Sequence, residues 1–150
     1  MLFPALVLSV AAAQVPEPPL TLSKAAPAQE TVASKTSHFA TISGKSPELK
    51  KAIDSKDLAA GLKLTGKIGA FTGTVSSTYS SRNHAAVYID FSEPWKNSIS
   101  GQVLAVNFSK FPILSELKGK RVLISGKFNA YRGTHPEVEI KSLKDIKIVK

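Results

Sequence analysis

The stretch RVLISGKFNAYRGTHPEVEI, residues 121–140, decides the fold class. Apolar and polar residues alternate in its first half, which is typical of a β-strand with one buried face. The residues predicted to face a core are Val122, Ile124, Phe128 and Ala130. The alternation resumes at Val138 and Ile140. Between the two alternating segments, Gly133 can adopt the positive φ that a tight turn needs, and Pro136 can begin an edge strand. The stretch therefore predicts a β-hairpin.

Three segments upstream show the same period of two. They are AFTGTVSSTYS (70–80), AAVYIDF (85–91) and QVLAVNF (102–108). Their predicted inward residues are Phe71, Gly73 and Val75, then Val87, Ile89 and Phe91, then Leu104, Val106 and Phe108. The segment FPILSELKG (111–119) predicts a short helix, and IKIV (146–149) completes the last strand. The predicted order is three strands, a helix and two strands.

Two glycines refine this prediction. Gly73 and Gly126 occupy inward positions in the two longest strands. In a small barrel such strands bend sharply to serve both sheets, and a glycine permits the bend where a side chain would collide with the opposite wall. We therefore expect a five-stranded barrel over residues 66–150.

Composition divides residues 1–65 into three segments. Residues 1–13 hold an uncharged apolar run ending in small residues, which is typical of a signal peptide cleaved before Gln14. A buried N-terminal helix is the alternative. Residues 14–36 are rich in Pro, Ala, Ser and Thr and predict a disordered tether. Residues 37–65 predict a helical lead-in that begins at a Ser46 cap. We expect a periplasmic or secreted protein with no membrane span in its mature chain.

Charge and cysteine usage limit the function classes. The 150 residues carry a formal net charge of +9, with a pI of about 9.8. Residues 14–35 contribute two lysines and two glutamates, so the surplus belongs to the folded part. A polyanion or an anionic surface is therefore a natural partner. The absence of cysteine excludes disulfides, thiolate metal sites and cysteine nucleophiles.

The strand order and two stretches of the sequence resemble those of a known domain family. IDFSEPWKN (89–97) and LKGKRVLISGKFNAYRGTHPEVEI (117–140) resemble the small OB-fold domains of bacterial exported proteins, of the nucleic-acid-binding and thermonuclease-like type. The resemblance covers residues 66–150 and implies a mainly β, five-stranded OB-fold barrel. It also implies a ligand face flanked by the loop between strands one and two and the loop between strands four and five. OB-folds bind oligonucleotides, oligosaccharides and proteins, so the fold alone leaves the partner open.

These two loops concentrate the residues suited to nucleic acid. Two of the three arginines and two of the three histidines lie in YSSRNHA (79–85) and YRGTHP (131–136). Arginine binds phosphate bidentately, and tyrosine rings near the face can stack on bases. The predicted nucleic-acid-binding residues are Arg82, His84, Tyr88, Lys127, Tyr131, Arg132 and His135.

Each assignment has a structural alternative. The tyrosines can cover the barrel ends, as Trp95 can, and Arg132 can pair with a glutamate of its own hairpin. Asp90, predicted beside Tyr88 on the outward face, would repel phosphate.

Catalysis is not expected from this sequence. The three histidines lack metal-ligand spacing, and no carboxylate set accompanies the arginines as a nuclease would need. We therefore predict no enzyme activity, no cofactor and no metal. The predicted function is a non-catalytic module that binds single-stranded or flexible nucleic acid. The alternative is a protein- or glycan-interaction module of the cell envelope that binds an acidic partner. The oligomeric state is left open.

Overall fold

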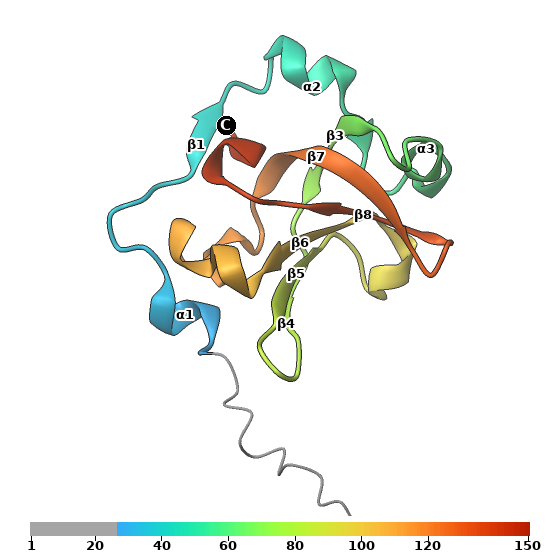
Figure 1. Ribbon diagram of the computed structural model, residues 1–150. Coiled ribbons are helices and arrows are strands. Elements are labelled where there is room, and N and C mark those ends of the chain that lie inside the picture. Colours follow the sequence, from blue (N-terminus) through green and yellow to red (C-terminus); the bar gives the residue numbers. More distant parts are fainter. Residues whose placement is uncertain (1–26) are drawn as a thin grey trace, which may run out of the picture.

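The computed structural model describes residues 27–150, which form a curled β-sheet with a few short helices around it (Figure 1). The strands of the described residues are β1 (Ala40–Ile42), β2 (Ile53–Asp54), β3 (Ile68–Thr74), β4 (Ser77–Ser80), β5 (Ala86–Asp90), β6 (Ser100–Leu104), β7 (Arg121–Tyr131), β8 (His135–Glu139) and β9 (Ile146–Val149). The helices are α1 (Gln29–Val32), α2 (Pro47–Lys51) and α3 (Leu58–Lys63), with 3₁₀ turns η3 (Trp95–Asn97), η4 (Ala105–Lys110), η5 (Leu114–Leu117) and η6 (Leu143–Asp145).

The strand pairings follow the curl of the sheet. β4 pairs with β5, β5 with β6, β6 with β8 in parallel, β8 with β7, and β7 with β3. β3 and β4 are consecutive in the chain and are separated only by Val75 and Ser76. The path of pairings thus comes back to the segment from which it began.

The structure has nine strands in its described part where the sequence predicted five. The first predicted strand is divided into β3 and β4, and the last into β8 and β9. The lead-in adds β1, which pairs in parallel with β9, and β2, which pairs in parallel with β3. The mainly β prediction therefore stands, but the strand count is higher than predicted, and the lead-in contains two short strands besides the helices α2 and α3.

The core lies inside the curl and holds most of the predicted inward residues. Buried members predicted from the alternation are Phe71, Val75, Val87, Ile89, Phe91, Val122, Ile124, Phe128, Val138 and Ile140. The prediction for 102–108 was wrong in phase at Leu104 and Val106, whereas Phe108 is buried as predicted. β6 ends at Leu104, its core residue is Val103, and Val106 is 80% exposed. Alternation fails there because the chain enters the 3₁₀ turn η4.

The two inward glycines lie where the chain is crowded. A β-carbon on Gly126 would lie 2.9 Å from Cγ1 of Val138, and Gly126 has a φ of 156°. A β-carbon on Gly73 would lie 2.7 Å from Cβ of Ser55. Side chains at either position would collide with packed neighbours. The positive φ predicted for Gly133 is confirmed at 76°.

Part of the predicted tether packs on the sheet's 3₁₀ turns. The side chain of Gln29 in α1 is buried, where its amide donates to the Pro112 carbonyl at 2.9 Å and accepts from the Leu114 amide at 2.9 Å. The Ser34 amide also donates to the Phe111 carbonyl at 2.8 Å. Residues 27–36 therefore differ from the disordered segment that composition predicted. The predicted signal peptide and the rest of the tether lie outside the described residues.

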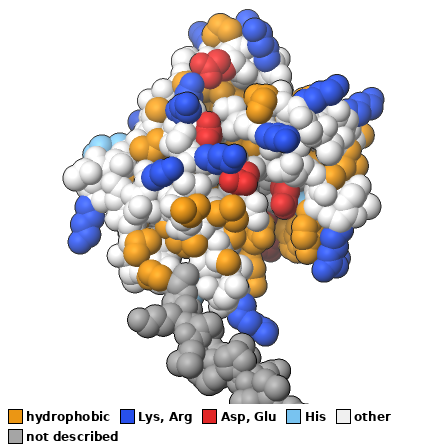
Figure 2. Space-filling view, viewed as in Figure 1, with side chains coloured by type: hydrophobic (Ala, Val, Ile, Leu, Met, Phe, Trp, Pro, Cys, Tyr) orange, Lys and Arg blue, Asp and Glu red, His pale blue; other side chains and the backbone are white. Residues whose placement is uncertain are grey.

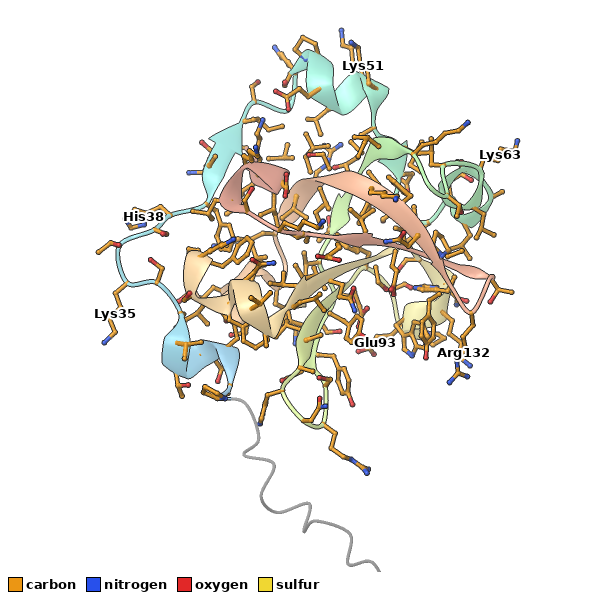
Figure 3. The ribbon with its side chains drawn as sticks, in the orientation of Figure 1. Lys35, His38, Lys51, Lys63, Glu93 and Arg132 are labelled. Atoms are coloured by element: carbon orange, nitrogen blue, oxygen red, sulfur yellow. The ribbon has the colours of Figure 1, made fainter. Side chains whose placement is uncertain are left out.

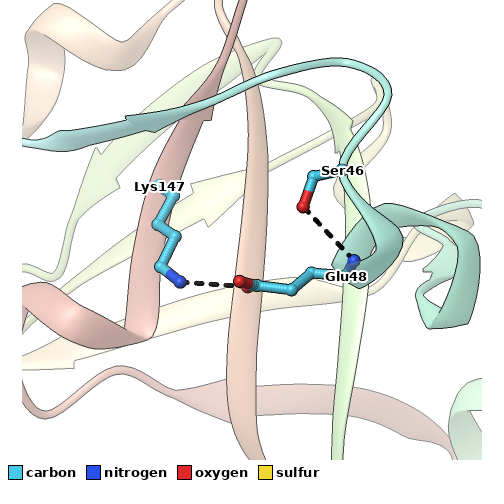
Figure 4. Close-up of polar contacts among 3 residues, drawn as sticks. All are labelled: Ser46, Glu48 and Lys147. Atoms are coloured by element: carbon cyan, nitrogen blue, oxygen red, sulfur yellow. Dashed lines mark hydrogen bonds and ion pairs between the residues drawn. The ribbon is translucent and has the colours of Figure 1, made fainter.

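The lead-in is held by a cap and an ion pair. The Ser46 hydroxyl accepts from the Glu48 amide at 3.3 Å, which confirms the predicted cap of α2. The Glu48 carboxylate accepts from Nζ of Lys147 in β9 at 2.9 Å (Figure 4). The lead-in is thereby joined to β9 beside the β1–β9 pair. Among the described residues, no helix is long and apolar enough to cross a membrane.

Candidate ligand-binding groove

The outer face of β4, β5 and β6 carries a row of polar and aromatic side chains. Antiparallel register places Tyr79 opposite Tyr88, and Tyr88 opposite Gln102. The Gln102 amide donates to the Tyr88 hydroxyl at 3.2 Å. Residues between them in the chain, such as Val87 and Ile89, point into the core. The alternation of each strand thus presents this row outward.

A second row lies beside the first and contains the acids. Register places Ser77 opposite Asp90, and Ser100 opposite Glu137 in the parallel β6–β8 pair. The buried Ser100 hydroxyl donates to Oδ1 of Asp90 at 3.0 Å and lies 3.1 Å from Nε2 of His135. Three strands are thereby joined through one buried hydroxyl group.

A groove of about 980 Å³ runs over these rows and the loop after β5. Its lining residues are Ser77, Thr78, Tyr79, Tyr88, Asp90, Ser92, Glu93, Pro94, Trp95, Ser100, Tyr131 and Glu137. Three of its four aromatic side chains are well exposed: Tyr79 by 59%, Trp95 by 41% and Tyr131 by 43%. Three carboxyl groups line it, and no lysine or arginine does. The groove thus presents rings and hydrogen-bond acceptors.

Lysines and arginines lie outside the groove lining. Figure 2 shows them spread around the molecule in this view, without a single basic patch. In Figure 3, Glu93 and Arg132 lie toward one side, while Lys51 and Lys63 lie around α2 and α3 at the top. The groove lining itself therefore carries carboxyl groups and no basic side chain.

Burial shifts the pKa of three titratable groups in or beside the groove. Desolvation raises the pKa of Asp90, and its hydrogen bond from Ser100 partly opposes that shift. Desolvation also raises the pKa of Glu137 and lowers the pKa of His135. In each case the low-dielectric surroundings disfavour the charged form.

The loop after β5 forms one wall of the groove. It contains a cis peptide bond between Glu93 and Pro94 and the 3₁₀ turn η3. The Trp95 ring meets the His135 ring edge-on, with centroids 4.8 Å apart and planes at 85°. Trp95 thus lines the groove on its exposed part and packs against β8.

The predicted site residues are only partly brought together. Tyr88 and Tyr131 line the groove, and His135 is buried beside Ser100. The Arg132 guanidinium lies 5.2 Å from the centroid of the Tyr131 ring, so it lies beside the groove.

Three predicted residues lie outside the lining. Arg82 and His84 belong to the turn between β4 and β5, where Nδ1 of His84 lies 3.1 Å from the Ser80 hydroxyl. Lys127 is exposed on β7 opposite Ile68 of β3. None of these three lines the groove.

The groove also contains residues that the prediction did not include. They are Tyr79, Asp90, Glu93, Trp95 and Glu137, together with small hydroxyl residues. The outward phase of Asp90 and Glu137 was readable from the alternation, but the convergence of the set depends on the β6–β8 pairing, which joins distant segments. Within residues 27–150, no group of three His, Asp or Glu side chains is arranged to hold a metal ion.

Comparison with known proteins finds similarity to solved structures alone. No protein-family model matches the chain, and no curated protein matches it. The chain is similar to the crystal structure of a protein assigned as an aspartyl-tRNA synthetase from Leishmania major Friedlin, with a TM-score of 0.44 and 10% sequence identity. The alignment covers 78% of this chain and 22% of that one. The chain thus spans less than a quarter of that protein's length, and a score at this level assigns no family.

Proposed function

We propose that residues 66–150 form an OB-type barrel and that the protein is a non-catalytic module binding single-stranded nucleic acid in the groove. The observation that carries this proposal is the set of three exposed rings, Tyr79, Trp95 and Tyr131, around one recess. Bases stack on such rings largely regardless of sequence, at about 1–3 kcal/mol per base.

The charges favour one orientation of the strand. The carboxyl groups of the groove would repel phosphates. The same carboxyl groups can accept hydrogen bonds from the N–H donors on base edges. The phosphates would therefore face outward, toward Arg132 beside Tyr131 and Arg82 in the β4–β5 turn. The net charge of +9 attracts the strand as a whole.

Fluorescence anisotropy with labelled oligonucleotides tests the proposal. Tyr79→Ala and Tyr131→Ala should each weaken binding by about 1–3 kcal/mol if the rings stack on bases. Replacing Arg82 and Arg132 together by Ala should remove most of the affinity. The matched control is the double replacement of Lys50 and Lys51 of α2, which should change little.

Salt dependence provides an independent measurement. With roughly three to five phosphates neutralised, log affinity should fall against log salt with a slope of about −2 to −3.5. A parent protein that does not bind oligonucleotides even at low salt would contradict the proposal, as would tyrosine variants that bind as well as the parent.

The groove lining favours a second candidate, a glycan-binding module of the cell envelope. Aromatic rings with carboxyl groups and no lysine or arginine suit a neutral sugar polymer better than the acidic partner predicted from net charge. Binding to a neutral oligosaccharide that persists at high salt, without oligonucleotide binding, would support it.

Export to the periplasm or outside the cell remains part of the proposal. Expression in a bacterium with the native N-terminus should give periplasmic protein that begins near Gln14. An intact cytoplasmic chain beginning at Met1 would contradict export but leave the groove proposal unaffected.

A further inference from the structure

We propose that the groove selects guanine among the bases, with the Glu137 carboxylate accepting hydrogen bonds from guanine N1–H and the N2 amino group. This inference rests on the proposed binding of single-stranded nucleic acid. It assigns Glu137 as the residue that determines base preference in the groove.

Glu137 occupies the right place for this role. It lies on β8, opposite Ser100 of β6 and Asn129 of β7, and its half-buried side chain lines the groove. Its neighbours in the chain, Pro136 and Val138, are buried, so the glutamate faces outward. Tyr131, the last residue of β7 before the turn at Gly133, lines the same groove and offers a ring for stacking.

The carboxyl group of Glu137 is free to accept a ligand. Oδ1 of Asp90 already accepts from the Ser100 hydroxyl. Within residues 27–150 the one ion pair joins Lys147 to Glu48, so Glu137 forms none there. A half-buried carboxylate without a cation is stabilised by any N–H donor that a ligand supplies.

The donor pattern of the bases decides which one fits. An ionised carboxylate only accepts hydrogen bonds, and its two oxygens can accept two parallel donors. Guanine presents N1–H and an N2 amino group side by side on its Watson–Crick edge. Thymine presents a single N–H between two carbonyl oxygens, and adenine and cytosine each place an amino group beside an acceptor nitrogen. Guanine is therefore the base whose edge matches both oxygens.

The experiment uses a labelled thymidine decamer and versions with one central dG, inosine, dA or dC. Inosine keeps N1–H and lacks the N2 amino group. The full-length protein should bind the dG decamer about tenfold more tightly than the all-thymidine decamer, with inosine between them, because a good bidentate contact to a base discriminates by that order. Glu137→Gln should remove the dG preference, so that this variant binds the dG and all-thymidine decamers with affinities within about twofold of each other.

The matched control is Glu139→Gln on the same strand, because Glu139 is paired with Gln102 and does not line the groove. This variant should keep the dG preference, and circular dichroism should show both variants folded. Equal binding of all five decamers, or a dG preference that survives in Glu137→Gln, would overturn the inference and leave the proposed function standing. Failure to bind any decamer would overturn both.

Discussion

The indole of Trp95 lies edge-on to the imidazole of His135, with their centroids 4.8 Å apart. His135 in turn contacts the Ser100 hydroxyl, which donates to Asp90. Trp95, in one wall of the groove, is thereby connected through His135 and Ser100 to Asp90. Edge-to-face ring pairs contribute about 0.5–1.5 kcal/mol beyond the burial of their area.

Trp95 is the only tryptophan in the chain, so its fluorescence should report the ionisation of His135. Burial lowers the pKa of His135 from 6.5, and the fluorescence should therefore change with a midpoint below that value as a charge forms beside the indole. His135→Gln should abolish the transition. A transition of unchanged midpoint in this variant would show that another group is responsible.

The same shift predicts how folding stability depends on pH. Since the folded state lowers the pKa of His135, the unfolded chain binds the proton more readily, and this group's contribution is complete above pH 6.5. It should be lost as the pH falls through the folded-state pKa. Urea denaturation of the parent and His135→Gln, from neutral to mildly acidic pH, should show a smaller loss in the variant. Equal losses would contradict the assignment.

Gly126→Val should destabilise the fold by about 1–3 kcal/mol, because its side chain would meet Val138 and the backbone has a positive φ. Gly44→Ala is the matched control, since its β-carbon would meet its nearest neighbour at an ordinary 3.5 Å. Thermal denaturation measures both. An unchanged melting temperature for Gly126→Val would contradict the close packing of β7 on β8.

Gln29→Leu should destabilise the protein by about 1–3 kcal/mol for each buried backbone group left without its partner. The groups concerned are the Pro112 carbonyl and the Leu114 amide. Glu30→Ala, at the adjacent exposed position of α1, should be nearly neutral. Hydrogen exchange should show faster exchange of the Leu114 amide in Gln29→Leu alone. Protection equal to that of the parent would mean that α1 does not anchor there.

The sequence predicted strands well where one face is continuously buried. In β5 and β7, alternation identified core residues such as Val87 and Ile124 because each strand keeps its period throughout. It failed at Leu104 and Val106, since apolar residues near the end of a strand also occur on the outward face and in 3₁₀ turns. The placement of Tyr88 on one face and Ile89 on the other follows from local alternation and could be predicted from the sequence alone.

The groove could be predicted only in part, because most of its chemistry arises between strands. Tyr88 and Tyr131 were identified as candidates from the expected face. The contact of Ser100 with His135 depends on the parallel pairing of β6 with β8, which a local pattern does not encode. Arg82 and Arg132 were predicted as site residues because they lie in two loops. The residues that line the groove are instead mainly acidic, aromatic and hydroxyl residues.

The pairing of β1 with β9 has a consequence for the order of assembly during synthesis. Ala40 is aligned with Lys147, and the amide of Lys150 donates to the Ile42 carbonyl at 2.8 Å. The partners of β1 are thus made only after the strands β2 to β8, and closing so long a segment of chain is slow. A nascent chain must hold residues 40–42 without their β9 partners until residues 147–149 have left the ribosome. β1 therefore pairs late, although it is made before every other strand that the structure describes.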